Sequence, residues 1–296
     1  MTTVTKTDVK PSRASETATV RRKLRGTTVV SRALQYVLIT ALAVFCIIPF
    51  GWLIATSVDS QAGNILQWPT FTVDHYVKLV TEAGTLRLLR NSLIIAIGAT
   101  VLTMLLGFIG GYALSRFRFR GRRFFMFFVL LIRVVPPTAT IVPLYLMMTK
   151  MHLNNSLLGL ILVEAAALLP LTLWQMKSAV DNVPLEIEEA AWVDGSSRVA
   201  AVIRIVFPVV GPTFGAAAMF AFVGAWGDFL TPLVLLQSQD LYPLSIGLFR
   251  AFSGFNQVDW GLLTATAIIY MLPPTILYML VRKYLFKAGL SGAIKG

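Results

Sequence analysis

Six long apolar runs alternate with short polar segments along this chain. They cover residues 33–56, 91–115, 124–148, 156–176, 213–236 and 261–280. A helix needs about 20 apolar residues to cross the hydrocarbon core of a bilayer, so each run is long enough to span it. Backbone polar groups in lipid must be satisfied within the chain, and helices do this segment by segment. The pattern therefore predicts an all-α integral membrane protein with six transmembrane helices.

The polar segments between the runs set the expected organisation. Residues 1–32 are rich in Thr, Ser, Lys and Arg and poor in large apolar side chains, so we expect a disordered tail. Residues 33–284 make up the six-span domain, and residues 285–296 form a C-terminal tail. Prolines interrupt the third and sixth runs, where they are compatible with bending helices and equally with kinks that serve packing alone.

The polar stretch 182–211, between the fourth and fifth runs, predicts two short helices joined at a glycine. Pro184 suits the first turn of a helix, and the acidic residues that follow it favour the positive end of the helix dipole. Gly195 can adopt the left-handed conformation that ends a helix, and the serines after it can cap a second one. Pro208 must then stop or bend that second helix. Such an elbow suits docking into a groove of another protein, although an ordinary amphipathic loop is the simpler alternative.

Composition excludes a soluble fold and leaves no role for metal or disulfide chemistry. Hydrophobic residues make up 56% of the chain and charged residues 14%, against about 25% charged in soluble domains. The chain has a single cysteine, which excludes an internal disulfide. Its two histidines are far apart in sequence and flank no other ligand types, so no metal site is expected.

The distribution of basic residues predicts the orientation in the membrane. If the N-terminus is cytoplasmic, 20 of the 26 lysines and arginines lie in cytoplasmic segments and 5 lie on the other side. Basic loops remain on the cytoplasmic side of membranes, so this bias predicts that both termini and the elbow are cytoplasmic. The same bias accounts for the net charge of +12 without any nucleic acid partner.

The motif within 182–211 resembles the coupling loop of ABC importer permeases. It reads Glu189-Ala190-Ala191, three residues, Gly195, nine residues, Ile205, one residue and Phe207-Pro208. The family pattern ends Ile-x-Leu-Pro, so Phe207 is a conservative departure from it. The resemblance implies a membrane subunit that docks a cytoplasmic ATPase through Glu189, Ala190, Ala191, Asp194, Gly195, Ile205 and Pro208.

Other stretches are similar to the maltose-type, carbohydrate-uptake branch of that family, over roughly Trp68 to Gly296. They include 68–76, 91–93, the run GYALSRFRFRGR at 111–122, and AWGDF at 225–229, where glycine stands in place of the family's usual asparagine. The last residues, GLSGAIKG, resemble the tail of the smaller maltose-type permease, which reaches toward the ATPases. The resemblance assigns that role here to Gly292, Lys295 and Gly296.

The resemblance also implies a set of partners in a bacterial inner or plasma membrane. They are a second homologous permease subunit, two copies of a cytoplasmic ABC ATPase and an extracellular or periplasmic sugar-binding protein, with membrane lipid around them. ATP and magnesium are expected on the ATPases, because this chain has no G-x-x-x-x-G-K-[ST] sequence to cradle a phosphate. No cofactor is expected on the chain itself.

Four residues in the spans are candidates for a translocation path. On straight helices Arg133 and Glu164 lie about 12–13 Å inside the membrane from opposite faces, so we hypothesise that they pair or face one polar cavity. A purely structural ion pair is the alternative. Trp226 and Asp228 lie in the outer half of the fifth span, where an aromatic face beside a carboxylate suits a sugar. An interfacial tryptophan near a loop acid is the alternative there.

These patterns together predict the permease subunit of an ATP-driven importer for a sugar, whether a mono-, di- or oligosaccharide or a polyol. Its mechanism would be alternating access driven through the elbow. An ABC permease for a glycerol phosphoester or a polyamine is the alternative, which the sparse intramembrane charge disfavours. A membrane-embedded enzyme or channel is a different class, but the spans contain no cluster of catalytic residue types, so no catalytic residue is expected.

Overall fold

The computed structural model describes residues 13–63, 68–81, 84–252 and 258–293, and the side chains within these ranges from residue 32 to residue 283. The chain divides into two units, Met1–Ala55 and Thr56–Gly296, which are described separately below. The described residues form helices joined by turns, with one isolated antiparallel bridge between Asp59 and Phe71. This agrees with the predicted all-α fold.

The described part of the first unit belongs to one helix, α1 (Arg13–Ser57). Its apolar portion, Arg32–Ser57, is 26 residues long and is a candidate membrane span, close to the predicted 33–56. The expectation of disorder over residues 1–32 was wrong from Arg13 onward, while residues 1–12 lie outside the described part. Residues 13–25 are rich in good helix formers, and no proline interrupts the chain between Pro11 and Pro49. A helix formed in the apolar part can therefore extend toward the N-terminus.

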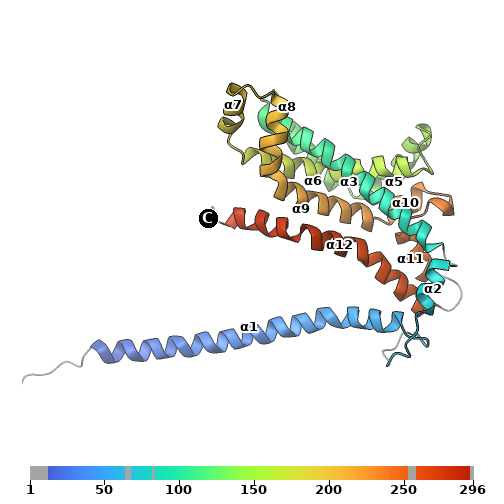
Figure 1. Ribbon diagram of the computed structural model, residues 1–296, viewed down its shortest axis with the longest axis horizontal. Coiled ribbons are helices and arrows are strands. Elements are labelled where there is room, and N and C mark those ends of the chain that lie inside the picture. The colour runs from blue at the N-terminus through green and yellow to red at the C-terminus, as the bar shows by residue number, and fades with distance from the viewer. Residues whose placement is uncertain (1–12, 64–67, 82–83, 253–257, 294–296) are drawn as a thin grey trace, which may run out of the picture. The chain divides into compact units, whose positions relative to one another are not determined.

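Four long helices form the centre of the second unit (Figure 1). They are α3 (Thr85–Arg116), α6 (Leu157–Asp181), α9 (Phe207–Gly227) and α12 (Trp260–Ala293). Helices α3, α6 and α9 pack on one another, and α12 packs on α9. At Gly111 of α3, an added Cβ would lie 2.7 Å from the backbone nitrogen of Lys177 on α6, so only glycine permits this approach.

The predicted third span is a bent pair of helices. It consists of α4 (Arg122–Leu131), a 3-10 turn η1 (Ile132–Val134) and α5 (Pro137–Lys150), and the two parts meet at 100°. Val135 and Pro136 are extended, because a residue that precedes a proline is disfavoured in the helical conformation. Pro137 then begins α5, where its missing N–H needs no partner.

The fifth span begins earlier than the prediction of 213–236. The candidate span runs over Arg198–Gly227, through α8 (Arg198–Ala201), a π-helical turn η2 (Val202–Val206) and α9. The chain turns at Asp228, and residues 230–235 form a separate short helix, α10 (Leu230–Leu235). Among the described residues, five helices are long and apolar enough to cross a membrane, and the bent pair makes a sixth candidate, which matches the predicted number.

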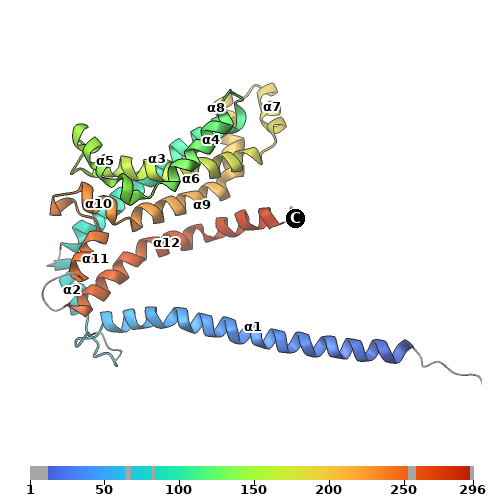
Figure 2. The ribbon, with the colours of Figure 1, turned by 180° about the vertical axis from the view of Figure 1, so that it is seen from behind.

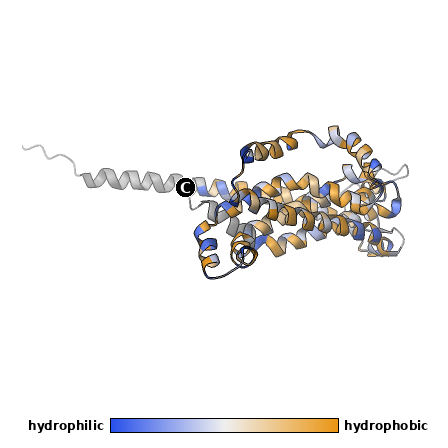
Figure 3. Cartoon of the chain, turned by 90° about the horizontal axis from the view of Figure 1, so that it is seen from above, coloured by the Kyte–Doolittle hydropathy of each residue, from blue (hydrophilic) through white to orange (hydrophobic). Residues whose placement is uncertain are grey.

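Shorter helices connect these elements. They are α2 (Asp74–Thr81), α7 (Leu185–Val193), a 3-10 turn η3 (Gln239–Leu241) and α11 (Leu244–Phe252). Hydrophobic residues run along most of the length of the long helices, whereas hydrophilic residues gather near their ends (Figure 3). Because many of these apolar side chains are exposed, the surface suits lipid rather than water.

Candidate functional site

The elbow at 182–211 is built around the left-handed conformation of Gly195, whose φ is +88°. Helix α7 ends there because the Gly195 N–H donates to the Trp192 carbonyl at 3.1 Å and the Ser196 N–H donates to the Ala191 carbonyl at 2.9 Å. This pair of bonds is a Schellman motif, and it requires a residue that tolerates positive φ. The Ser197 hydroxyl then accepts a bond from the Ala200 N–H at 3.2 Å and caps α8. The predicted helix, glycine and cap are confirmed.

The sequence predicted that the second helix of the elbow stops or bends at Pro208, and in the structure this helix does not stop there. Helix α8 continues through η2 into α9 without a break in the helical backbone, and the direction of the helix changes where α9 begins (Figure 2). Pro208 cannot donate to the carbonyl four residues earlier, and its ring would crowd that carbonyl in a regular helix. The wider π-helical turn over Val202–Val206, which includes the half-buried Ile205, lies at the position where this crowding must be relieved.

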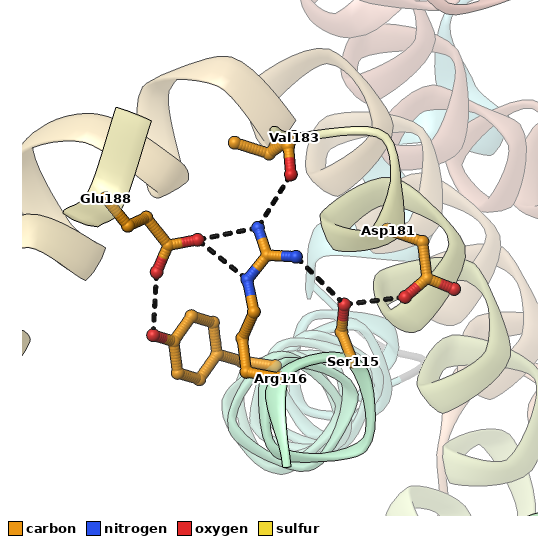
Figure 4. Close-up of polar contacts among 6 residues, drawn as sticks. Ser115, Arg116, Asp181, Val183 and Glu188 are labelled. Carbon is orange, nitrogen blue, oxygen red and sulfur yellow. Dashed lines mark hydrogen bonds and ion pairs between the residues drawn. The ribbon is translucent and has the colours of Figure 1, made fainter. Parts of the chain in front are cut away.

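A buried ion pair attaches α7 to the end of α3 (Figure 4). Arg116, the last residue of α3, donates from Nε to Glu188 Oε1 at 2.7 Å, and its Nη2 lies 2.6 Å from the same oxygen. Nη2 also donates to the Val183 carbonyl at 2.8 Å. The side chain of Glu188 is 0% exposed and that of Arg116 is 13% exposed. Arg116 therefore holds both α7 and the segment that precedes it.

Further polar contacts extend this attachment toward α6. Tyr112, one turn before Arg116 on α3, donates from its hydroxyl to the second Glu188 oxygen at 2.8 Å. The Ser115 hydroxyl donates to Asp181 at 2.6 Å, and Asp181 also pairs with Lys177. Three helices, α3, α6 and α7, thus meet in one hydrogen-bonded cluster at the end where α3 and α6 terminate.

The opposite side of the elbow remains exposed. Glu189, Ala190, Asp194 and Gly195 are all exposed, whereas Ala191 is buried against the rest of the chain. Across the turn, the Arg198 guanidinium lies 5.3 Å from the centre of the Trp192 ring, a cation–π contact that ties α8 to α7. The elbow is therefore held on its inner side and free on its outer side.

The roles of Glu188 and Arg116 were not predicted from the sequence. Glu188 was counted with the acidic residues that favour a helix start, and Glu189 was singled out instead, yet Glu188 is the buried one. The available signal was the spacing of Tyr112 and Arg116, which lie four residues apart on one face of the α3 terminus. Periodicity identifies such a face but does not identify its partner 72 residues later in the chain.

The predicted pairing of Arg133 with Glu164 was wrong. Arg133 lies in η1 at the bend of the broken span and is exposed, so the depth calculated for a straight helix does not apply to it. Glu164 is buried on α6, and its nearest charged neighbour is Asp228 at the end of α9 rather than Arg133. One carboxyl oxygen of Glu164 has no hydrogen-bond partner among the described residues. Of the four path candidates, the structure therefore places Glu164 near Asp228 and not near Arg133.

Trp226 and Asp228 both have structural partners at the end of α9. The Trp226 side chain is buried, stacks on Phe222 and donates from Nε1 to the Tyr270 carbonyl at 3.1 Å. The Tyr270 hydroxyl donates in turn to the Trp226 carbonyl at 2.8 Å, so α9 and α12 are bonded in both directions. Asp228 accepts from the Leu230 N–H at 2.9 Å and caps α10.

The three C-terminal residues assigned by resemblance lie at or beyond the limit of the described chain. Gly292 is in the last turn of α12. Lys295 and Gly296 lie outside the described residues.

Apolar helices of spanning length, joined by short polar turns, define a multi-pass integral membrane protein. The chain belongs to the family of binding-protein-dependent transport system inner membrane components, which matches residues 103–288 and so includes the elbow and the last three long helices. It is therefore a membrane component of a transport system, and its family is one of permease subunits rather than enzymes.

Two relatives agree with this membership, and a solved structure shares the fold. A diacetylchitobiose uptake system permease protein of Streptomyces coelicolor is 32% identical over 257 residues, which cover 85% of each chain. A maltodextrin transport system permease protein of Bacillus subtilis is 30% identical over 272 residues, covering 90% of this chain and 97% of its own. A bacterial ABC transporter that imports alginate contains a chain of the same fold, with a TM-score of 0.76 at 19% identity, over 94% of this chain and 100% of that one.

Proposed function

We propose that this chain is the translocation subunit of an ATP-driven importer for a sugar or oligosaccharide. The elbow, with its buried anchor to α3 and its exposed outer side, is the observation on which this proposal depends. A surface that receives mechanical force must be rigid on one side and accessible on the other. Relatives named for diacetylchitobiose and maltodextrin uptake support a carbohydrate as the cargo.

The proposal includes an orientation with both termini and the elbow in the cytoplasm. The excess of lysine and arginine in the N-terminal segment, the loop at 116–123 and the elbow supports it. In this orientation Glu189, Ala190 and Asp194 face the compartment that contains ATP. Gly292, Lys295 and Gly296 then lie on the same side and would approach the same partner.

The proposed partners are a second permease subunit, two ABC ATPases and a sugar-binding protein outside the membrane. The family description itself refers to a binding protein, which supports the last of these. This chain lacks a phosphate-binding G-x-x-x-x-G-K-[ST] sequence, so ATP hydrolysis must be carried by partner subunits. Closure of the ATPases would displace the elbow and reorient the helices, so that the translocation path opens alternately to the two sides of the membrane.

Cysteine cross-linking tests the docking of the elbow in the assembled complex. Cys46 is the only cysteine of the chain, so Cys46→Ser provides a background into which single cysteines can be placed. Ala190→Cys should be captured by a bifunctional maleimide together with the ATPase. Val80→Cys, also exposed but on α2, is the matched control and should not be captured. Capture at Val80 alone, or labelling of Ala190→Cys from outside intact cells, would contradict the proposal.

Transport by the reconstituted complex tests the cargo. Proteoliposomes that contain the complex and its binding protein should accumulate a labelled mono-, di- or oligosaccharide only when ATP is supplied. Accumulation of a polyamine or a glycerol phosphoester, with no sugar transported from a broad panel, would reject the sugar assignment and leave the elbow assignment intact.

A further inference from the structure

A cavity of about 1100 Å³ lies between α4, α6 and the loop before α4, outside the elbow and the path candidates. Helices α4 and α6 pack beside each other there (Figure 2). Small-molecule pockets occupy about 300–1,000 Å³, so this cavity is large for a single phosphate or a monosaccharide.

The walls of the cavity change from basic to apolar along its length. Arg118, Arg122 and Arg123 line it at the start of α4, and Lys177 lines it near the end of α6. Asp181 is the one acidic residue of the lining, and it is already paired with Lys177 and bonded to Ser115. The lining therefore carries an excess of positive charge. Neither Arg118 nor Arg123 forms an ion pair in the part of the chain that the structure describes.

The apolar end is formed by side chains further into the same two helices. Phe127 and Leu130 lie five and eight residues after Arg122 on α4, so Leu130 is about 12 Å further along the helix. On α6, which ends at this same end of the unit, Trp174 lies seven residues before Asp181, or about 10 Å deeper. Two independent helices thus place charge at one end and aromatic or aliphatic surface at the other. Phe127, Leu130 and Trp174 are all exposed to the cavity or its opening.

We propose that this cavity binds an anionic phospholipid, with its phosphate between Arg118, Arg122 and Arg123 and an acyl chain along Phe127, Leu130 and Trp174. Basic pockets between membrane helices recognise anionic headgroups by charge, and the apolar wall provides the contact that a soluble phosphate would not use. Charge complementarity and the direction of the gradient both favour a lipid over an acidic protein segment. The inference depends only on insertion in a membrane and holds for any cargo.

Quenching of Trp174 fluorescence by lipids brominated on the acyl chain tests this site in the assembled complex. The Trp174 contribution is the difference between the native chain and Trp174→Phe, since five other tryptophans contribute equally to both. Brominated phosphatidylglycerol should quench this contribution at a lower mole fraction than brominated phosphatidylcholine. The preference should fall by roughly fivefold in Arg118→Gln and again in Arg123→Gln.

Arg120→Gln is the matched control, because it removes the same charge from the same loop at a position that does not line the cavity. It should keep the preference for phosphatidylglycerol, and the melting temperature of every variant should match that of the native complex. Equal quenching by the two lipids would overturn the proposal, as would equal losses in Arg118→Gln and Arg120→Gln. Complete competition by millimolar inorganic phosphate would reduce the site to a phosphate site, and no quenching by either lipid would mean that a protein partner covers it. Both outcomes would also overturn the proposal.

Discussion

The ion pair between Arg116 and Glu188 should be the strongest single attachment of the elbow to the membrane helices. Breaking a buried pair by removing one partner costs about 3–5 kcal/mol, because the other charge remains buried without compensation. Glu188 is completely buried, whereas Arg116 keeps 13% of its side chain exposed and can recover part of its hydration. We therefore expect Arg116→Gln to cost about 3–5 kcal/mol of unfolding free energy, and Glu188→Gln to lie near the lower end of that range.

The double variant separates the pair from its surroundings. With both residues changed to glutamine no charge is left buried, so the combined loss should be smaller than the sum of the single losses, with an interaction energy of about 2–3 kcal/mol. Tyr112→Phe should cost about 1.5–3 kcal/mol alone, because its hydroxyl donates to the same carboxylate. Reversible unfolding of the full chain in SDS mixed micelles measures these differences.

The exposed pair Arg87–Asp240 provides the control for this cycle. Its side chains are 50% and 76% exposed, so the same glutamine substitutions should show an interaction energy below about 1 kcal/mol. If the Arg116 and Glu188 losses were simply additive, or no larger than those of the exposed pair, the ion pair would not be what holds α7. The functional readout is ATP hydrolysis by the assembled complex without cargo, which should lose its dependence on the binding protein when the anchor is broken.

Two further predictions concern backbone positions that only glycine satisfies. Gly111→Val should destabilise the packing of α3 on α6 by about 1–3 kcal/mol, since its side chain would meet the α6 backbone; Gly211→Ala, where an added Cβ meets nothing within 4 Å, should be close to neutral in the same SDS titration. Gly195→Ala should cost about 1–2 kcal/mol through its positive φ alone, because the space around it is open. We expect less cross-linking at Ala190 and unchanged packing of α3. An unchanged cross-link would show that the turn tolerates the substitution.

The membrane spans and the elbow were accessible to sequence reasoning because both depend on local chemistry. Run length and apolarity predict spanning helices without any knowledge of their neighbours. Gly195 and the capping serine act within one turn of the chain, and the structure confirms the conformation predicted for them. The place where the third run is interrupted was also visible, because the two consecutive prolines at 136 and 137 determine it.

The errors came from features that depend on partners distant in sequence or on the angle between helices. The prolines indicated a break, but they did not indicate the 100° angle between the two helices that flank Arg133. Glu164 lies near Asp228, a residue 64 positions later in the chain, and no periodicity in either helix identifies the other. The continuity of α8 with α9 was missed because Pro208 normally ends a helix, and a π-helical turn is a rare way to accommodate it.

The continuous helix from α8 to α9 and the buried anchor together suggest how movement at the elbow would reach the membrane. Helix α7 is bonded to α3, whereas α8 is the beginning of the helix that continues through η2 and α9 to Asp228, so a partner that displaces the elbow acts on two helices at once. From the π-helical turn to Asp228, α9 is about 33 Å long, and a tilt of about 10° at that turn would move its far end by about 5–6 Å. Asp228 accepts from the first backbone N–H groups of α10 and lies near Glu164 on α6. We therefore propose that the far end of α9 cannot move without rearranging α10 and α6, and that this rearrangement changes access to the path.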